Sequence, residues 1–369
     1  MVCRYNVDVP HWDQWEFVPI LNKWYAGTLS WHDFWTQHNE HRLIFPRLLM
    51  LALALPTGWN IYFEYGASII LALGLFALFA RWVWTHSGQL RPSTLWILPV
   101  IAALLFSPSQ WQNWYLGWQL QIFMNLLAVA GGLLILDTPQ ITWLRLAGAA
   151  GCGIVATYSF ANGFLFWFLA LPVLATRTAV PGSPRRLPLT VWTLLSVLTL
   201  ASFFWGFHTA GKSIEPVLLL RSLHILFVYV LKYLGGTIVY VRHTGPVDTA
   251  FHQYGALVGG AIGIATAGGL LAKTWMCRRD KIADLMPMAM IALYAILSAL
   301  LAGAGRLGNE STAQALSSRY ITIANLFWVA LLCMGIRIMG HNAAAKQTLA
   351  RRLGMAAGLL VLLGFVAMG

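Results

Sequence analysis

Residues 286–305 read MPMAMIALYAILSALLAGAG, an apolar run of 20 residues without an acidic or basic side chain. A helix of that length crosses the hydrocarbon core of a bilayer, which is roughly 30 Å thick. Comparable runs recur at 59–81, 94–109, 119–136, 144–159, 162–177, 188–207, 254–273, 319–339 and 354–369. Backbone groups in lipid must hydrogen-bond within their own segment, and these runs are too long for barrel strands. The sequence therefore predicts an all-α integral membrane protein.

Two further apolar runs, 43–57 and 217–240, are ambiguous. Pro56-Thr57-Gly58 interrupts the first, and the second carries Arg221, His224 and Lys232. Each is expected to form a full span, half of a hairpin or a helix lying in the interface. The total is then about 10 to 12 transmembrane helices.

The composition excludes several classes of protein. Charged residues make up 10% of the chain, against about 25% in soluble domains. The net charge of +12 comes from Lys and Arg scattered in ones to threes, which is typical of membrane loops, so no nucleic-acid partner is expected. The four cysteines have no CxxC spacing, and the chain has no HExxH motif. We therefore expect no metal and no cofactor.

The basic loops predict the orientation. They are densest at 184–186, 273–281 and 337–352, and such loops lie on the inner face. Alternating crossings then place residues 1–42, 107–118, 207–253 and 306–318 on the outer face. We expect a multi-pass protein of the inner (plasma) membrane.

The first 42 residues differ from the rest of the chain. They hold five of its twelve acidic residues and five tryptophans. We therefore expect residues 1–42 to form an outer-face loop with interfacial helices that carries the chemistry, and residues 43–369 to form a polytopic transmembrane domain.

Two carboxylates in this loop are candidate catalytic groups. Asp13 lies between Trp12 and Trp15, which suits an acid held at an interface and acting as a general base. The alternative is a helix N-cap or a solvated acid. Glu40 shares a predicted helix face with His41, where it is either a second catalytic carboxylate or a partner of Arg42 at a helix start.

Later stretches supply candidate binding residues. Planar amides and indoles are the usual means of holding carbohydrate, and they fill residues 110–121; the alternative is an aromatic belt. The candidates in that run are Gln110, Gln112, Asn113, Trp114 and Gln119. Arg319 begins an apolar run and suits a lipid phosphate, or else it is a snorkelling anchor; Arg221 and Lys232 are second candidates.

Four short motifs together resemble the GT-C type of polytopic membrane glycosyltransferase, which includes the protein O-mannosyltransferases and the lipid A aminoarabinose transferases. They are Pro10-His11-Trp12-Asp13-Gln14-Trp15, His38-Asn39-Glu40-His41-Arg42, Gln110 to Trp114, and Ser317-Ser318-Arg319-Tyr320.

The resemblance implies a sugar transferase that works at the outer face of the membrane, facing the periplasm. The donor would be a polyprenyl-phosphate-linked sugar and the acceptor a hydroxyl of a glycan or lipid. Asp13 matches the position of the family's base. The second acid of many relatives is replaced here by Gln14, so Glu16 or Glu40 would assist, or no second acid does. Substrate contacts are expected from Trp12, Gln14, Trp15, His41 and Arg42.

Other classes stay open at this point. An O-antigen ligase or polymerase would rely on Arg242, His243 and His252 instead of Asp13. A lipid-linked sugar transporter or flippase would show two pseudo-symmetric halves, and the sequence has no such repeat. A non-catalytic membrane scaffold is the simplest alternative.

Overall fold

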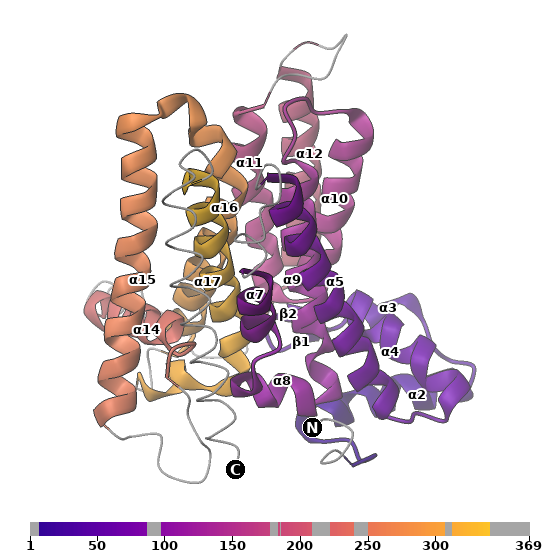
Figure 1. Cartoon of the computed structure of the whole chain (residues 1–369). Coiled ribbons are helices and arrows are strands. Elements are labelled where there is room, and N and C mark those ends of the chain that lie inside the picture. The colour runs from indigo at the N-terminus through magenta and orange to yellow at the C-terminus, as the bar shows by residue number, and fades with distance from the viewer. Residues whose placement is uncertain are drawn as a thin grey trace. The chain divides into compact units, whose positions relative to one another are not determined.

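A computed structural model describes residues 7–86, 97–177, 184, 186–208, 222–239, 250–306 and 312–339, without the side chain of Asp280. The described chain is almost entirely helical, and its one sheet is a two-stranded hairpin (Figure 1). It forms two compact units, each built from separated segments of the sequence: 1–75, 110–223 and 304–308 in the first, and 76–109, 224–303 and 309–369 in the second.

Six helices in the described chain are long and apolar enough to cross a membrane, which confirms the predicted all-α membrane class. They are α5 (Tyr62–His86), η3 with α9 (Gly117–Gln119 and Leu120–Ile135), α12 (Arg186–Phe204), α15 (Ala250–Cys277), α16 (Ile282–Ala304) and α17 (Ser318–Met339).

The remaining expected spans correspond to shorter apolar helices: α7 (Ile97–Leu105), α10 (Trp143–Thr157), and η4 with α11 (Ala161–Phe164 and Leu165–Ala175). The run at 354–369 lies outside the described residues. The total of about 10 to 12 spans stays a prediction.

In its described residues, each ambiguous run contains a single short helix. The first is α4 (Ile44–Thr57), which ends where Gly58 adopts the left-handed conformation with φ of 63°. Only glycine adopts that conformation without strain, so the predicted interruption is a helix C-cap. The second is α14 (Leu223–Gly235). At 14 and 13 residues, both helices are about 20 Å long, shorter than the hydrocarbon core.

Short helices of the N-terminal segment belong to the first unit: η1 (Trp12–Phe17), α2 (Val18–Tyr25) and α3 (Trp31–Trp35). Ser30 and Asp33 form a capping box at the start of α3, and the Asp33 carboxylate also accepts from the Lys23 ammonium. These donors, Lys23 first, hold the pKa of Asp33 well below its ordinary value. The pair therefore links α2 to α3.

The N-terminal segment shares one apolar core with the helices that follow. Phe17, Ile20 and Phe34 pack in the same buried cluster as Leu43, Met50, Trp118, Leu120, Tyr158 and Phe203. Figure 1 shows α2 and α3 beside α4. In the structure, then, the described part of this segment packs against later helices.

In the second unit, α14 and α15 cross at a contact that only glycine permits. A Cβ on Gly260 would lie 1.9 Å from the Leu231 carbonyl oxygen, and one on Gly235 would lie 1.7 Å from that of Ala256. Small residues let helix backbones approach closely in a membrane, where packing holds helices together. Farther along α15, Gly268 has open space around it.

We predict that Gly260→Ala lowers the stability of the chain while Gly268→Ala does not. Both changes add the same methyl group to the same helix, where alanine is intrinsically favoured over glycine. Only at Gly260 does the methyl meet backbone, at a cost of about 1–3 kcal/mol. The midpoint of thermal unfolding in detergent measures the difference. Equal midpoints for the two variants would contradict the α14–α15 crossing.

Candidate functional site

A hairpin in the first unit organises the polar residues of the N-terminal segment. Strands β1 (Gln37–His38) and β2 (His41–Arg42) pair antiparallel, with Gln37 opposite Arg42 and His38 opposite His41. Asn39 in the two-residue loop has φ of 47°, as tight hairpin turns require. Directly opposed residues share a face of a sheet, so the two histidines lie on one face and Gln37 and Arg42 on the other.

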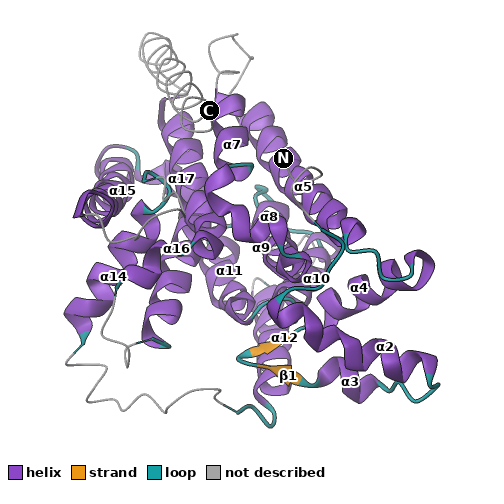
Figure 2. Cartoon of the chain, turned by 90° about the horizontal axis from the view of Figure 1, so that it is seen from below, coloured by secondary structure: helices purple, strands orange, loops and turns teal. Residues whose placement is uncertain are grey.

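The hairpin lies beside α12 (Figure 2), and the side chains of its Gln37–Arg42 face form hydrogen bonds to backbone groups at and just after the end of that helix. The Arg42 guanidinium donates to the carbonyl oxygens of Phe203 at 2.7 Å, Trp35 at 2.8 Å and Trp205. The Gln37 amide exchanges hydrogen bonds with the backbone of His208, accepting at 3.1 Å and donating at 2.5 Å. Arg42, predicted to contact substrate, is 3% exposed, and in this structure it supports the hairpin.

On the other face, His38 lies next to Asp13. The His38 Nε2 is 3.8 Å from the Asp13 Oδ2, and the edge of the His38 ring meets Trp118 with centroids 5.2 Å apart. The Asp13 side chain is 61% exposed, whereas that of His38 is 13% exposed. A carboxylate open to solvent thus lies beside an imidazole that the protein holds in position.

His41 on the same face has a different environment. Its Nδ1 accepts the Ala161 backbone N–H at 3.0 Å, and its ring stacks on Phe160 with centroids 4.4 Å apart. Desolvation lowers the pKa of His41 to about 3, and the positive charges of His38 and Arg306 add to the shift. His41, predicted to bind substrate, therefore stays neutral and anchors the hairpin to the start of η4.

Exposed indoles flank Asp13. Trp12 is 61% exposed and Trp15 55% exposed, and the Trp12 ring stacks on His11. Trp12 has φ of 48°, in the left-handed region that side chains other than glycine rarely adopt. Such backbone strain concentrates at functional sites. Asp13 thus directly follows a strained residue, and the indoles at positions 12 and 15 are exposed.

Gln14, the residue after Asp13, points inward. It is 0% exposed, and its Nε2 donates to the Glu64 Oε2 at 2.5 Å; the other oxygen of Glu64 accepts the Trp59 Nε1–H at 3.0 Å. Gly117 gives this pair its space, because a Cβ there would lie 2.2 Å from the Glu64 Oε2. Gln14 therefore joins η1 to the first turn of α5, and its contact with substrate stays a prediction.

The amide and indole run lies largely inside the first unit. Gln110, Gln112, Asn113 and Trp114 are all buried, and Trp114 stacks on Phe123 with centroids 4.6 Å apart. Gln119 is half-buried. The run meets the N-terminal segment at its end, through Gly117 and Trp118. Its role in carbohydrate binding stays a prediction.

Glu40, the other predicted catalytic acid, is exposed in the hairpin loop, whereas the predicted helix over this stretch is replaced by β1 and β2. The helical face expected for Gln37, Glu40 and His41 is thus wrong. In the described part of the chain, no group of three or more His, Cys, Asp or Glu side chains is arranged to hold a metal ion.

Two of the three candidate lipid-phosphate residues, Lys232 and Arg319, fall in the second unit. The Lys232 Nζ donates to the Thr312 Oγ1 at 2.7 Å, and the next residue, Tyr233, stacks on Tyr320 with centroids 5.1 Å apart. The Arg319 guanidinium lies 5.2 Å from the centre of the Tyr320 ring. The tyrosine pair therefore joins α14 to the start of α17, next to both cations. Arg221 lies outside the described residues.

Three residues emerge that the sequence prediction did not assign to the site: His38, Trp118 and Glu64. Glu64 had a visible signal, since an acid in the first turn of a long apolar helix needs a partner. His38 and Trp118 had none, because their contact joins residues 80 positions apart. Of the alternative ligase residues, His252 lies on α15 against Phe251, and Arg242 and His243 are outside the described residues.

The arrangement can hold and transfer a proton at an exposed carboxylate with a neighbouring imidazole. Comparisons with known proteins add no assignment, because no family model, no curated protein and no solved structure matches the chain. A function therefore has to be argued from these residues.

We predict that His41 makes stability depend on pH. The unfolded chain takes up a proton at His41 near pH 6.5, whereas the folded chain does so only near pH 3, so the free energy of unfolding falls as the pH drops between these values. In His41→Asn the amide oxygen keeps an acceptor near the place of Nδ1 but does not titrate. The fall in unfolding midpoint from about pH 7.5 to about pH 5 should shrink.

The control for His41→Asn is His32→Asn, since His32 is exposed on α3 in the same segment. That variant should keep the pH dependence of the wild type. If His41→Asn also keeps it, the neutral, buried state of His41 is wrong.

We predict that Glu64→Gln destabilises the first unit. Both oxygens of Glu64 accept hydrogen bonds from N–H groups. In either orientation, the amide of the glutamine variant would therefore place its NH2 group against the N–H of Gln14 or of Trp59. If the Gln14 amide also turned over, its oxygen would no longer accept a hydrogen bond from the His11 backbone N–H. An unsatisfied buried donor costs about 1–3 kcal/mol. The unfolding midpoint should fall, while exposed Glu40→Gln leaves it unchanged; an unchanged midpoint in Glu64→Gln would overturn the Gln14–Glu64–Trp59 link.

Proposed function

We propose that the chain is a membrane glycosyltransferase that moves a sugar from a polyprenyl-phosphate donor to an acceptor hydroxyl. One observation carries the proposal: the exposed Asp13 carboxylate lies 3.8 Å from the His38 Nε2, and the nearby residues Trp12 and Trp15 of the same short helix are exposed. The reaction requires a base that reaches water and a surface that holds a sugar, and this cluster supplies both.

In the proposed step, Asp13 takes the proton of the acceptor hydroxyl as its oxygen attacks the anomeric carbon. The bond from that carbon to the lipid phosphate breaks, and the lipid phosphate leaves with the electron pair. A carboxylate needs no cofactor for this role. His38 keeps Asp13 in place and, when protonated, stabilises its negative charge before the proton arrives.

The indoles support sugar as the substrate. Trp12 and Trp15, on the same short helix as Asp13, are exposed, and flat apolar faces such as theirs pack against the C–H groups of a sugar ring. The apolar faces also suit the membrane interface, where Trp is enriched. The acceptor would then approach from solution along a surface that the N-terminal segment already provides.

Lys232 and Arg319 support a lipid phosphate as the leaving group. Each is half-buried on or beside a helix of the second unit, near the end from which α17 starts. Phosphate oxygens accept from Lys as a point charge and from Arg as a fork of donors. Cations of this kind stabilise the negative charge of a phosphate bound beside them. The proposal places the reaction on the outer face of the inner membrane, as the basic loops predict.

We predict that Asp13→Asn lowers transfer at least about a hundredfold, the scale of a lost general base, in purified full-length chain given a polyprenyl-phosphate sugar and a hydroxyl acceptor. The asparagine keeps the shape of the side chain but takes no proton. Release of lipid phosphate and of glycosylated product are both measured, because they must fall together.

His38→Gln should lower transfer less than Asp13→Asn, and His32→Gln, a matched change on exposed α3, should leave it unchanged. All variants should keep the wild-type unfolding midpoint to within the error of the measurement. Wild-type transfer by Asp13→Asn would reject the assignment of the base. Loss only on substitution of His252 would favour the ligase class instead.

A further inference from the structure

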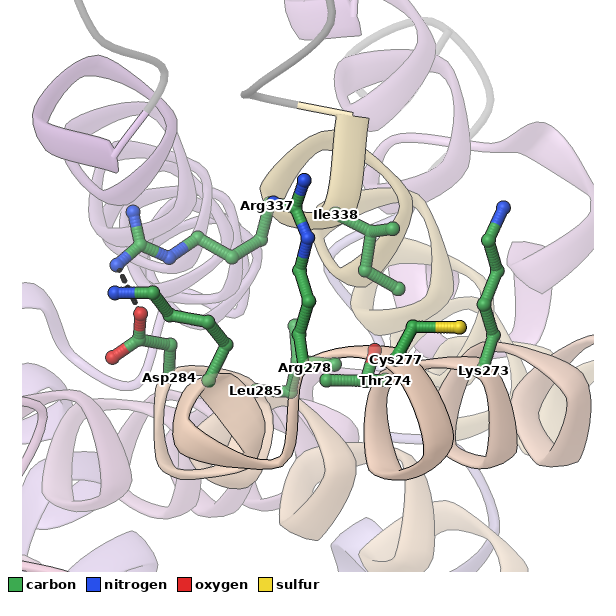
Figure 3. Close-up of a pocket in the computed structure, with 9 residues that line it drawn as sticks. Lys273, Thr274, Cys277, Arg278, Asp284, Leu285, Arg337 and Ile338 are labelled. Carbon is green, nitrogen blue, oxygen red and sulfur yellow. Dashed lines mark hydrogen bonds and ion pairs between the residues drawn. The ribbon is translucent and has the colours of Figure 1, made fainter.

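A pocket of about 170 Å³ lies in the second unit, at the end of α15 and α17 and the start of α16 (Figure 3). The turn η5 (Arg279–Lys281) joins α15 to α16 at this place. The pocket is lined by Lys273, Thr274, Cys277, Arg278, Lys281, Asp284, Leu285, Arg337 and Ile338. It is smaller than the roughly 300–1,000 Å³ of sites for drug-sized ligands, and so suits a single small group.

The lining is strongly cationic. Its lining holds four basic side chains and one carboxylate. The carboxylate, Asp284, accepts a hydrogen bond from the Arg337 Nη2 at 2.7 Å. Figure 3 shows that bond at one side of the pocket, with Lys273 of α15 and Arg278, the residue after α15, farther along it. Among the described side chains that line the pocket, the cations outnumber the carboxylate. An anion bound among them would relieve their mutual repulsion.

The pocket lies at a membrane boundary. Arg337 follows Arg319 by 18 residues on α17, a rise of about 27 Å, close to the thickness of the hydrocarbon core. Trp275 and Met276 are exposed beside the pocket, and the Arg279 guanidinium lies 4.2 Å from the centre of the Trp275 ring. An indole of this kind marks the headgroup level. The pocket is therefore at the opposite end of α17 from Arg319.

We infer that this pocket binds a phosphate group, supplied by the headgroup of an anionic phospholipid. Arg278 offers a fork of donors and Lys273 a point charge, while Leu285 and Ile338 give the apolar wall that the glycerol end of a lipid requires. Basic pockets between membrane helices on the negatively charged inner leaflet hold such headgroups. The site is separate from the proposed transfer reaction and does not depend on it.

Cys277 provides a built-in reporter, because its thiol is exposed and lines the pocket. The test reconstitutes the purified full-length chain in nanodiscs of phosphatidylcholine, with or without phosphatidylglycerol. The labelling rate of Cys277 by an uncharged maleimide is followed by peptide mass spectrometry. Phosphatidylglycerol should slow labelling about fivefold, the protection expected when a ligand is present at about four times its Kd.

The matched variants are Arg278→Gln, inside the pocket, and Arg279→Gln, its neighbour outside the lining. Both remove one positive charge. Arg278→Gln should bring the ratio of the two labelling rates close to one, and Arg279→Gln should leave it as in the wild type. The ratio cancels any direct effect of a variant on the thiol. Lys273→Gln serves as the second pocket variant should Arg278→Gln fail to fold.

A third arm adds inorganic phosphate to phosphatidylcholine nanodiscs, which separates the two sources of the anion. No protection by phosphate together with protection by phosphatidylglycerol supports the lipid. Protection by phosphate alone keeps the phosphate site and rejects the lipid as its source. Equal labelling in all three conditions overturns the inference, as does an equal loss of protection in Arg278→Gln and Arg279→Gln.

Discussion

Two buried arginines hold the N-terminal segment in place, and the candidate site depends on them. Arg42 donates to carbonyls of Trp35, Phe203 and Trp205, and Arg47 on α4 donates to those of Asp33, Phe34 and Thr36. Carbonyls at the end of a helix have no partner within it, and a buried cation needs acceptors. The carbonyl oxygens and the guanidinium groups therefore satisfy one another's hydrogen bonds. These bonds join the end of α12 to the hairpin and the end of α3 to α4.

The hairpin that ends at Arg42 has two faces with different surroundings. On its Gln37–Arg42 face, both side chains form hydrogen bonds to backbone groups. On its other face His41 is kept neutral by burial, while His38 stands beside an exposed carboxylate. The strand pair places the His41 ring against the start of η4 and the His38 ring beside Asp13 of η1. The two imidazoles therefore have different environments although they are only three residues apart. A rigid frame of this kind is what a positioned base requires.

In the second unit, both ends of α17 carry cations with distinct surroundings. Arg319 lies against Tyr320 near Lys232, and Arg337 pairs with Asp284 at the edge of a cationic pocket. The expected excess of basic loops on the inner face predicts charge at the second end, but not its convergence on a cavity. In our two proposals, a phosphate group would be the ligand of the cations at each end.

The sequence by itself determined the class of the protein and most of its helices. Apolar runs identified the long helices, because lipid leaves the backbone no other partner, and Pro56-Thr57-Gly58 marked a real helix end. Only the tertiary structure decided what each polar side chain does. Gln14 bonds to a residue 50 positions away and Arg42 to one 161 positions away, so both turn inward as supports. Packing between distant segments determines such partners, and a local pattern of residue types does not predict them.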